Sequence, residues 1–345
     1  MPLRCVEPEG GRTLHAFDLS PETWDALAAE NRRRGHLRMP CCAAQVSLRR
    51  SKLGTRYFAH RSAGTCTTAP ETEAHLRLKQ LVVEVAREHG WAAETEVAGQ
   101  TPSGEPWRAD VLAHRGAARV AVEIQWSSQT HDETCRRQAR YAQSGVRGLW
   151  LFRQASFPVE ERLPAARLLG TPDTGFRASL PDLFERERQV LPMPEFLAAA
   201  FGKRLRFGLP LGVEARFTVH GARLTCWRCE ARTQILRDVE VKAGPHRARW
   251  SVPSLGRRPG LWEGIRARLP SSFPSGTVRP RFSKTQGVKQ LINGCSHCGA
   301  LIGEHVQPEA GDDQYVISEF AAPLEEPWRG ALLGHEGGVA GWGVY

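Results

Sequence analysis

The sequence predicts an α/β fold with a mixed sheet at its centre. Two runs with helical spacing of apolar residues and four strand-like runs occupy residues 67–155, in the order helix, three strands, helix, strand. Strands joined by short turns pair antiparallel, whereas a strand that follows a crossover helix pairs in parallel. This order therefore predicts a three-stranded meander followed by one crossover strand.

The elements of this core can be justified in order. Glu71 and Glu73 suit the positive end of a first helix, which His89-Gly90 ends. Its buried stripe consists of Leu78, Leu81, Val82 and Val85. The remaining elements are strands at about 92–97, 107–113 and 120–126, a helix at about 132–143 and a buried strand at 146–152.

Two of these strands carry acidic residues. Side chains along a strand alternate with period two, so Glu123 and Gln125 share a face, and a turn at Gly116 would bring Asp110 beside Glu123. Two carboxylates among buried strands repel each other and are costly to desolvate unless a cation lies between them. Oxygen ligands favour Mg²⁺ or Mn²⁺, which predicts a divalent-metal site. The alternative is that both acids are solvated or pair with nearby arginines.

Composition divides the chain of 345 residues, which is long enough for two or three domains. We expect a small N-terminal β module (1–66), the α/β core (67–155), a connector with short helices (156–204), a basic domain (205–310) and an acidic, loosely ordered tail (311–345).

Positive charge is concentrated near the C-terminus. Residues 201–290 contain 19 Lys and Arg against 5 Asp and Glu, a net of +14, and residues 291–345 contain 1 against 8, a net of −7. A basic surface of this size suits a polyanion such as nucleic acid. The alternative is an arginine-rich surface that only keeps the protein soluble.

The location of the protein is indicated by what the sequence lacks. No apolar run reaches the length of a membrane span, and no hydrophobic signal core is present at the N-terminus. We therefore expect a cytoplasmic protein with no membrane association. In that compartment, nine cysteines, four of them in CxxC pairs, favour metal binding over disulfides.

The two CxxC pairs are Cys226-Trp-Arg-Cys229 and Cys295-Ser-His-Cys298. Two such knuckles suit a tetrahedral Zn²⁺ site with four thiolates and no open position for catalysis. The spacing predicts a structural zinc ribbon with a long insertion, inside the basic region that would bind nucleic acid. His297 is a weaker competitor for one ligand position.

A third metal site is conceivable near the N-terminus. Its ligands would be Cys41, Cys42, His60 and Cys66. Adjacent cysteines are a poor geometry for one ion, so buried thiols and a core histidine are the default interpretation.

Several short motifs occur in a fixed order over residues 38–155. They are Tyr57-Phe-Ala-His60, Glu71-Thr-Glu73-Ala-His75-Leu-Arg-Leu-Lys79, Arg108-Ala-Asp110-Val, Glu123-Ile-Gln125-Trp-Ser127, Arg137…Tyr141 and Gly148-Leu-Trp150. In this combination the segment resembles the competence protein CoiA-like nuclease family. That family looks like a branch of the PD-(D/E)xK nuclease superfamily, which implies a restriction-endonuclease-like αβββαβ core.

The resemblance also implies roles for individual residues. Asp110 and Glu123 would bind the catalytic Mg²⁺ or Mn²⁺, and Gln125 stands where most superfamily members have lysine. Glu73 would be an accessory acid. Phosphate or nucleic-acid binding is implied for Lys79, Arg137, Arg140 and Tyr141, and Lys79 could instead replace the missing lysine. The alternatives are that Glu73 only favours the helix N-terminus and that the arginines form a solvated face beside Glu133.

Taken together, the sequence predicts a metal-dependent nuclease that hydrolyses DNA phosphodiester bonds. The resemblance suggests a role in competence and recombination or in DNA defence, with single-stranded or branched DNA and recombination proteins as partners. The alternative is a catalytically silent DNA-binding protein or recombination mediator.

Overall fold

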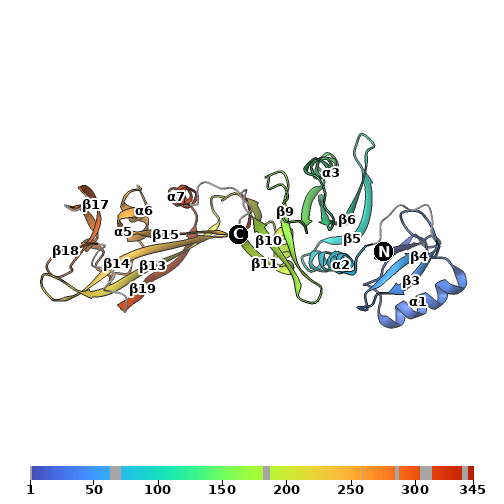
Figure 1. The fold of residues 1–345 in the computed structure, drawn as a ribbon, viewed down its shortest axis with the longest axis horizontal. Helices are drawn as coiled ribbons and strands as arrows, with labels where there is room; N and C mark the ends of the chain where they lie inside the picture. The colour runs from blue at the N-terminus through green and yellow to red at the C-terminus, as the bar shows by residue number, and fades with distance from the viewer. Residues whose placement is uncertain are drawn as a thin grey trace. The chain divides into compact units, whose positions relative to one another are not determined.

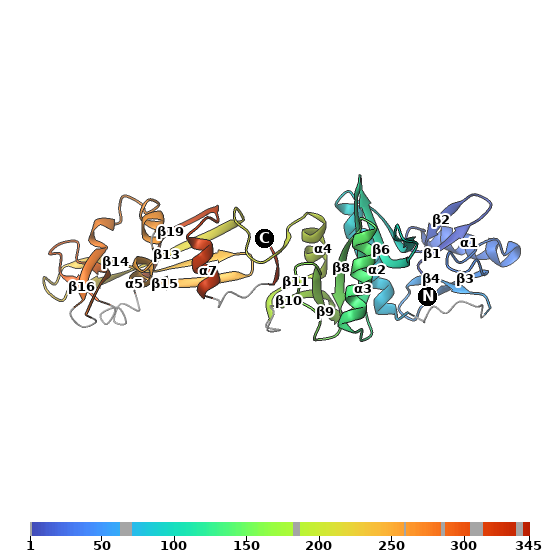
Figure 2. The same ribbon diagram turned by 90° about the horizontal axis from the view of Figure 1, so that it is seen from above.

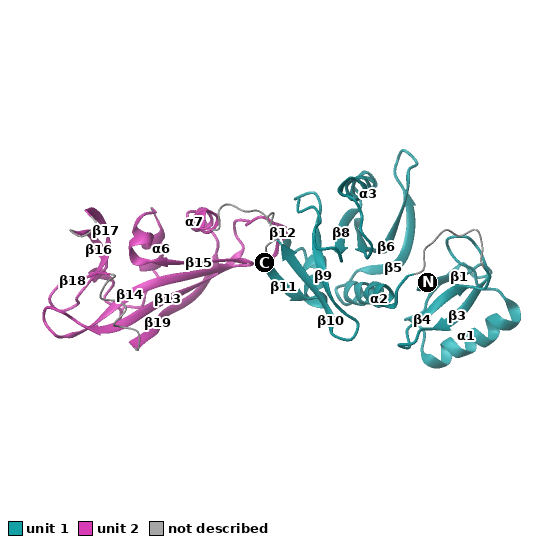
Figure 3. Ribbon diagram, viewed as in Figure 1, with its two compact units in different colours: residues 1–205 teal, residues 206–345 magenta. Residues whose placement is uncertain are grey.

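The computed structural model describes residues 2–62, 71–181, 187–258, 260–283, 287–303, 313–335 and 341–345. The chain divides into two compact units, residues 1–205 and 206–345 (Figure 3). Each unit has its own sheets and its own apolar core, so each is described by itself.

The N-terminal part of unit 1 is a small module of two hairpins and one helix (Figure 1). Its elements are β1 (Arg4–Glu7), β2 (Arg12–His15), α1 (Pro21–Arg34), β3 (Val46–Arg50) and β4 (Arg56–His60). Trp24 of α1 packs on Phe58 of β4, with ring centroids 5.2 Å apart, and both side chains are buried. This contact joins the helix to the second hairpin.

The rest of unit 1 is built on one seven-stranded sheet. The strand order is β11-β10-β9-β8-β7-β6-β5. Its first four strands are β5 (Ala92–Gln100), β6 (Pro106–Arg115), β7 (Ala118–Gln125) and β8 (Arg147–Phe152). β5, β6 and β7 form an antiparallel meander, and β8 pairs in parallel with β7. The predicted meander and crossover are confirmed, and the sheet is mixed.

Helices α2 (Glu73–Glu88) and α3 (His131–Gln143) lie on opposite sides of the central strands in Figure 1. The hydroxyl oxygen of Thr72 caps the start of α2, and that of Thr130 caps α3, because each accepts a hydrogen bond from an N–H of the first turn. The apolar stripe of α2 is buried, as the spacing of its leucines and valines predicts.

Residues 156–204 do not form the expected connector with short helices. They add β9 (Ala165–Thr171), β10 (Gly175–Pro181) and β11 (Glu187–Pro192) to the sheet, and α4 (Met193–Phe201) follows. Phe201 of α4 packs against Trp91, with ring centroids 5.6 Å apart. The alternating apolar residues of β9 and β10 give the physical reason, since they bury one face of each strand in spite of the surrounding charges.

Unit 2 contains a four-stranded antiparallel sheet, β15-β14-β13-β19, and a small three-stranded sheet, β16-β17-β18 (Figure 2). Its strands are β12 (Leu205–Phe207), β13 (Glu214–Thr225), β14 (Arg232–Ala243), β15 (His246–Ser251), β16 (Arg279–Ser283), β17 (Val288–Gly294), β18 (Leu301–Ile302), β19 (Gln314–Pro323) and β20 (Trp342–Val344). Its helices are α5 (Val252–Gly256), α6 (Leu261–Arg266), the 3₁₀ turn η1 (Ser275–Thr277) and α7 (Trp328–His335).

The described part of the acidic segment 311–345 is integrated into unit 2, which differs from the loosely ordered tail that the composition suggests. β19 pairs along β13, and Phe320 of β19 stacks on Phe217 of β13 with ring centroids 4.8 Å apart. Trp328 and Leu332 of α7 are buried in the same core. Apolar residues at alternate positions of β19 outweigh the acidic composition of the segment.

No helix in the described ranges is both long enough and apolar enough to cross a membrane.

Candidate active site

The acidic residues of the two central strands lie opposite each other. β6 and β7 pair with Val111 opposite Val122, and this register, continued by one residue, places Asp110 opposite Glu123. The Asp110 carboxylate accepts a hydrogen bond of 2.9 Å from the backbone N–H of Ile124. The predicted pairing of the two acidic strands is therefore present, and it brings both acids to the middle of the sheet.

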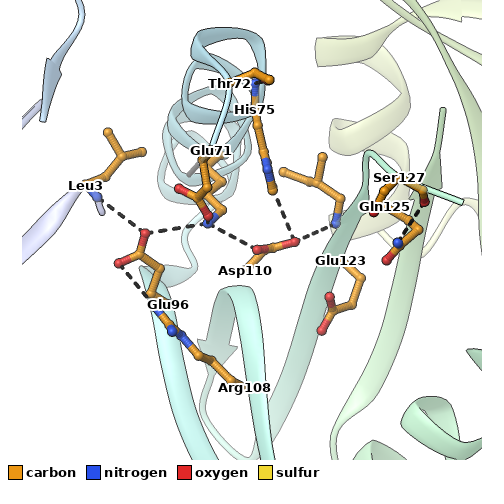
Figure 4. Close-up of polar contacts among 12 residues, drawn as sticks. Leu3, Glu71, Thr72, His75, Glu96, Arg108, Asp110, Glu123, Gln125 and Ser127 are labelled. Carbon is orange, nitrogen blue, oxygen red and sulfur yellow. Dashed lines mark hydrogen bonds and ion pairs between the residues drawn. The ribbon is translucent and has the colours of Figure 1, made fainter. Parts of the chain in front are cut away.

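Asp110 is held by two side chains of α2. Its Oδ1 lies 3.1 Å from Nζ of Lys79, and its Oδ2 lies 3.5 Å from Nε2 of His75 (Figure 4). Burial alone would raise the pKa of Asp110, but the charge of Lys79 and the hydrogen bond from His75 outweigh it and hold that pKa well below the ordinary value. Asp110 is therefore a half-buried carboxylate that stays ionised.

Glu123 is held by the other helix. Its carboxylate accepts hydrogen bonds from the guanidinium of Arg137 and the hydroxyl of Tyr141, both on α3. In Figure 4 the Glu123 side chain extends away from His75 and the residues of α2. Burial and the nearby charge of Asp110 raise the pKa of Glu123 to about 7, although Arg137 opposes the shift. The two carboxylates thus differ in protonation because their surroundings differ.

Glu71 is the third acid at this site, and the sequence analysis assigned that place to Glu73. The candidate ligand atoms of Glu71, His75 and Asp110 all lie within 4.8 Å of one another. Glu73 instead accepts hydrogen bonds from Thr55, at 2.8 Å, and Arg77, at 3.3 Å. Glu71 precedes the cap residue Thr72 and is not part of α2, so helical spacing does not predict where its carboxylate lies. Glu73 is two residues from His75, and residues two apart on a helix point in different directions.

Lys79 lies inside the protein, which differs from the predicted contact with nucleic acid. Only 1% of its side chain is exposed, and its ammonium contacts Glu71, Asp110 and Glu96. Burial alone would lower the pKa of Lys79, but these three carboxylates raise it above its ordinary value. The side chain is therefore a buried cation beside Asp110, in keeping with the alternative that it replaces the missing lysine of the motif.

The remaining predicted residues are Gln125, Tyr141 and Arg140, and each has a different position. Gln125 donates a hydrogen bond from its amide to the carbonyl of Ser127 and accepts one of 3.3 Å from Arg137. Tyr141 is buried, and its hydroxyl oxygen also lies 3.0 Å from the carbonyl oxygen of Arg108, so the hydroxyl faces Glu123 and not the surface. Arg140 lies elsewhere and pairs with Glu105, 3.5 Å away.

Glu96 of β5 is a site residue that the sequence analysis missed. In the β5–β6 ladder Thr95 pairs with Val111 and Val97 with Ala109, so Glu96 falls opposite Asp110 at a break in the pairing. Its backbone φ of +59° is rare outside glycine, and it turns the carboxylate inward. Glu96 then accepts from the N–H of Leu3 and lies 3.5 Å from Lys79. Strand alternation offers no signal for it, because the irregularity inverts the local pattern.

The four knuckle cysteines of unit 2 form a cluster that could bind a metal such as zinc. Sγ of Cys226 lies 3.7 Å from that of Cys298, and Sγ of Cys229 lies 3.8 Å from that of Cys295. Four sulfurs at about 2.3 Å from a tetrahedral ion would lie about 3.8 Å apart, so the spacing fits. Burial alone would raise the pKa of Cys295, but knuckle N–H groups outweigh it and lower that pKa to about 6. A thiolate is the form that binds metal.

The two weaker metal-site predictions, His297 as a zinc ligand and a cluster of N-terminal cysteines with His60, have different outcomes. Nε2 of His297 lies 3.1 Å from the carbonyl oxygen of Arg232, and His297 is not a member of the four-cysteine cluster. Cys41, Cys42 and His60 do lie together, with Sγ of Cys42 3.2 Å from Nε2 of His60. Cys66, the fourth residue of that expected set, lies outside the described residues.

Comparison with known proteins bears on the same segment. Residues 71–162 match the family described as "Competence protein CoiA, nuclease-like domain". This segment of the chain is therefore similar to a CoiA nuclease-like domain, and it contains Asp110, Glu123 and their partners from both helices.

Two further comparisons add little. The crystal structure of a protein of unknown function, AF1548, is similar over 27% of this chain and 58% of its own chain, with 17% sequence identity and a TM-score of 0.22. The chain thus spans less than two thirds of that protein, and nothing about fold or activity follows from so low a score. No curated protein matches the chain.

Glu123 makes stability depend on pH. Its pKa is raised from 4.5 to about 7, so the folded protein binds the proton more tightly than the unfolded chain does. The stability from this group is full below pH 4.5 and is lost as the pH rises through about 7, by on the order of 3 kcal/mol. We expect urea unfolding at several pH values, without divalent ions, to show this loss, and Glu123→Gln to flatten it. The exposed control Glu84→Gln should leave the loss unchanged; a decline that persists in Glu123→Gln assigns it to another group.

Glu94 and Glu96 provide a matched pair of substitutions on β5. Glu96→Gln should cost roughly 1–3 kcal/mol in the free energy of unfolding, because it removes one buried partner of Lys79. Glu94→Gln should cost less than about 1 kcal/mol, because the ion pair of the half-exposed Glu94 with Arg4 is screened by solvent. Urea denaturation at neutral pH compares them, and equal costs would contradict the assigned role of Glu96.

The cysteine cluster can be tested by metal content. Cys226→Ser or Cys295→Ser should lower bound zinc by about one equivalent relative to the unaltered protein, because either change removes one of four ligands. The matched control is Cys5→Ser, because Cys5 belongs to none of the candidate metal-ligand groups of the described residues. Elemental analysis of the purified proteins provides the measurement, and unchanged zinc in both cluster variants would refute the site.

Proposed function

We propose that the protein is a metal-dependent nuclease that hydrolyses phosphodiester bonds of DNA. One observation carries the proposal: two carboxyl groups, the half-buried Asp110 and the buried Glu123, lie opposite each other on neighbouring strands, in a segment that matches a CoiA nuclease-like domain. Acids enclosed in this way need a positive charge nearby. A divalent ion would supply that charge, and binding a phosphate would be its function.

The residues present fit a divalent ion. Asp110 offers an ionised carboxylate, and Glu71 and His75 bring an oxygen and a nitrogen to within 4.8 Å of it. Nε2 of His75 lies 3.5 Å from Oδ2 of Asp110, so a neutral imidazole could bind the same ion as that carboxylate through the lone pair of this atom. Carboxylate and imidazole together suit Mg²⁺ poorly but Mn²⁺ well. Glu123 is outside this group of ligand atoms, because Arg137 and Tyr141 of α3 hold its carboxylate. It would join the ion as the second carboxylate only after turning away from them.

The bound ion would polarise the phosphate and make a water easier to deprotonate. The protein's own groups supply the rest. Lys79 keeps Asp110 ionised, and Glu123, with a pKa near neutrality, can accept a proton at physiological pH. Arg137 reaches Glu123 and Gln125 from α3, with about a quarter of its side chain exposed, so its guanidinium can also contact a phosphate. Gln125 can orient water but supplies no charge.

The wider placement follows from the same features. The order helix, three strands, helix, strand over residues 73–152 supports the proposal of a PD-(D/E)xK core, and the CoiA match supports a role in competence or recombination more than in DNA defence. We propose that Cys226, Cys229, Cys295 and Cys298 hold a structural Zn²⁺ in a ribbon. The basic surface of residues 201–290 would then bind DNA, with single-stranded or branched DNA favoured.

A second function, a catalytically silent DNA-binding protein or recombination mediator, is favoured by one observation. Asp110 and Glu123 are each already compensated by a side chain, Lys79 and Arg137, so their charges do not require an ion. A protein of this kind would keep the basic surface and the cysteine cluster and would not depend on Mg²⁺ or Mn²⁺.

Cleavage assays separate the two functions. The full-length protein is incubated with single-stranded, duplex and branched DNA, and with RNA of the same sequence, in the presence of Mg²⁺ or Mn²⁺. We expect Asp110→Asn and Glu123→Gln each to lower the cleavage rate by about 100-fold or more. Asp110→Asn removes the ionised ligand of the proposed ion, and Glu123→Gln removes the group that can accept a proton.

Glu133→Gln is the control, since Glu133 lies on the solvent side of α3 and pairs with Arg136. Gel-shift retention of DNA by the Asp110 and Glu123 variants shows that they still bind. DNA retention by the unaltered protein without cleavage under any of these conditions would support the silent function instead.

A further inference from the structure

An indole ring is exposed on the first cysteine knuckle of unit 2. Trp227 lies between Cys226 and Cys229, and 64% of its surface is exposed. Its Nε1 donates a hydrogen bond of 2.8 Å to the carbonyl of Leu301 on β18. This bond fixes the ring by its edge, so the apolar face stays in solvent in one orientation. Large rigid aromatics are normally buried, and an exposed one that is held in place favours a ligand with a flat apolar face.

Two arginines lie on β16, which β17 separates from β18 in the same small sheet. Leu301 of β18 pairs with Gly294 of β17. The guanidinium of Arg281, on β16, packs on Gly294, because a Cβ added at Gly294 would lie only 2.5 Å from its Nη2. The same guanidinium donates a hydrogen bond of 2.8 Å to the carbonyl of Gly299. Trp227 and Arg281 therefore contact the two members of one strand pair. We call Trp227, Arg279 and Arg281 the knuckle surface.

The charge of the knuckle surface is not balanced locally. Burial and the proximity of Arg279 lower the pKa of Arg281. Within the described residues neither arginine makes an ion pair with a carboxylate. Residues 279–303 contain four Lys or Arg residues and no Asp or Glu. An anion that binds beside two such cations would relieve their mutual repulsion.

We propose that the knuckle surface binds single-stranded nucleic acid, with one base stacked on Trp227 and the flanking phosphates on Arg281 and Arg279. A base has a flat apolar face and an adjacent negative charge, which matches an indole beside guanidinium groups. In a duplex the base faces are covered by their neighbours, so the indole selects unpaired bases. The inference rests on the proposed function only in that nucleic acid is the ligand, and it assigns the substrate form.

The test uses the full-length, zinc-loaded protein without Mg²⁺ or Mn²⁺, so that binding is measured without cleavage. The probes are a fluorescein-labelled oligothymidylate of about 15 nucleotides and an abasic strand of equal length, which keeps the phosphates and lacks the bases. Fluorescence anisotropy gives Kd for each. Trp227→Ala should weaken binding of oligothymidylate about ten-fold and change binding of the abasic strand by less than about two-fold. Arg281→Ala should weaken binding of both and reduce the salt dependence by about one charge.

Two controls guard against misfolding. Trp227→Phe should recover most of the lost affinity because it restores an aromatic face, and Leu211→Ala removes another exposed apolar side chain of unit 2 outside the knuckles. Zinc content should stay unchanged in all variants. Three results would overturn the inference. In the first, Trp227→Ala binds oligothymidylate as tightly as the unaltered protein does. In the second, its affinity for oligothymidylate and for the abasic strand falls equally. The third result is that duplex DNA of the same length binds more tightly than oligothymidylate. Cleavage assays are independent: oligothymidylate binding without nuclease activity leaves this inference standing and removes only the proposed function.

Discussion

The ion pairs of the buried Lys79 ammonium are the interaction on which the rest of unit 1 depends. The ammonium lies among Glu71 before α2, Glu96 on β5 and Asp110 on β6, so a single cation joins the helix to two strands of the sheet. A buried charge with fewer partners would be strongly destabilising, so the helix and the strands must keep this arrangement. Because Glu96 also accepts from the N–H of Leu3, and Arg4 donates to the carbonyl of Glu96, the N-terminal module is bound to the same group. The site is therefore the place where three parts of unit 1 meet.

Charge compensation around the acids is asymmetric across the sheet. On the side of α2, a lysine and a histidine keep Asp110 ionised. On the side of α3, burial keeps the proton on Glu123 to near neutral pH although Arg137 and Tyr141 bind its carboxylate. Asp110 and Glu123 thus differ in protonation. Lys79 and His75 outweigh the burial of Asp110, whereas Arg137 does not outweigh the effect of burial and of the Asp110 charge on Glu123. This division is the pattern by which paired carboxylates take different roles in a reaction.

The core was predictable from sequence because its signals are local. Apolar spacing indicated α2, α3 and the meander, and period-two alternation placed Asp110 and Glu123 opposite each other. Glu71 and Glu96 were missed because their positions depend on non-local features, the side of the helix that meets the sheet and a strand irregularity with φ of +59°. β9 to β11 were missed because proline and charge masked short alternating runs. Whether Arg137 faced solvent or Glu123 depended on how α3 packs, which spacing alone does not determine.

The cysteine cluster also has a consequence for how unit 2 folds. Cys229 and Cys295, whose sulfurs are 3.8 Å apart, are separated by 66 positions along the chain, and the segment between them contains β14, β15, β16 and β17. An ion bound to these four thiolates would close this long loop, and the entropy of loop closure grows only slowly with length. Such an ion would therefore cross-link the chain around two strands of the four-stranded sheet, β14 and β15, and two of the three-stranded sheet, β16 and β17, so that one small cluster would restrain both sheets of unit 2.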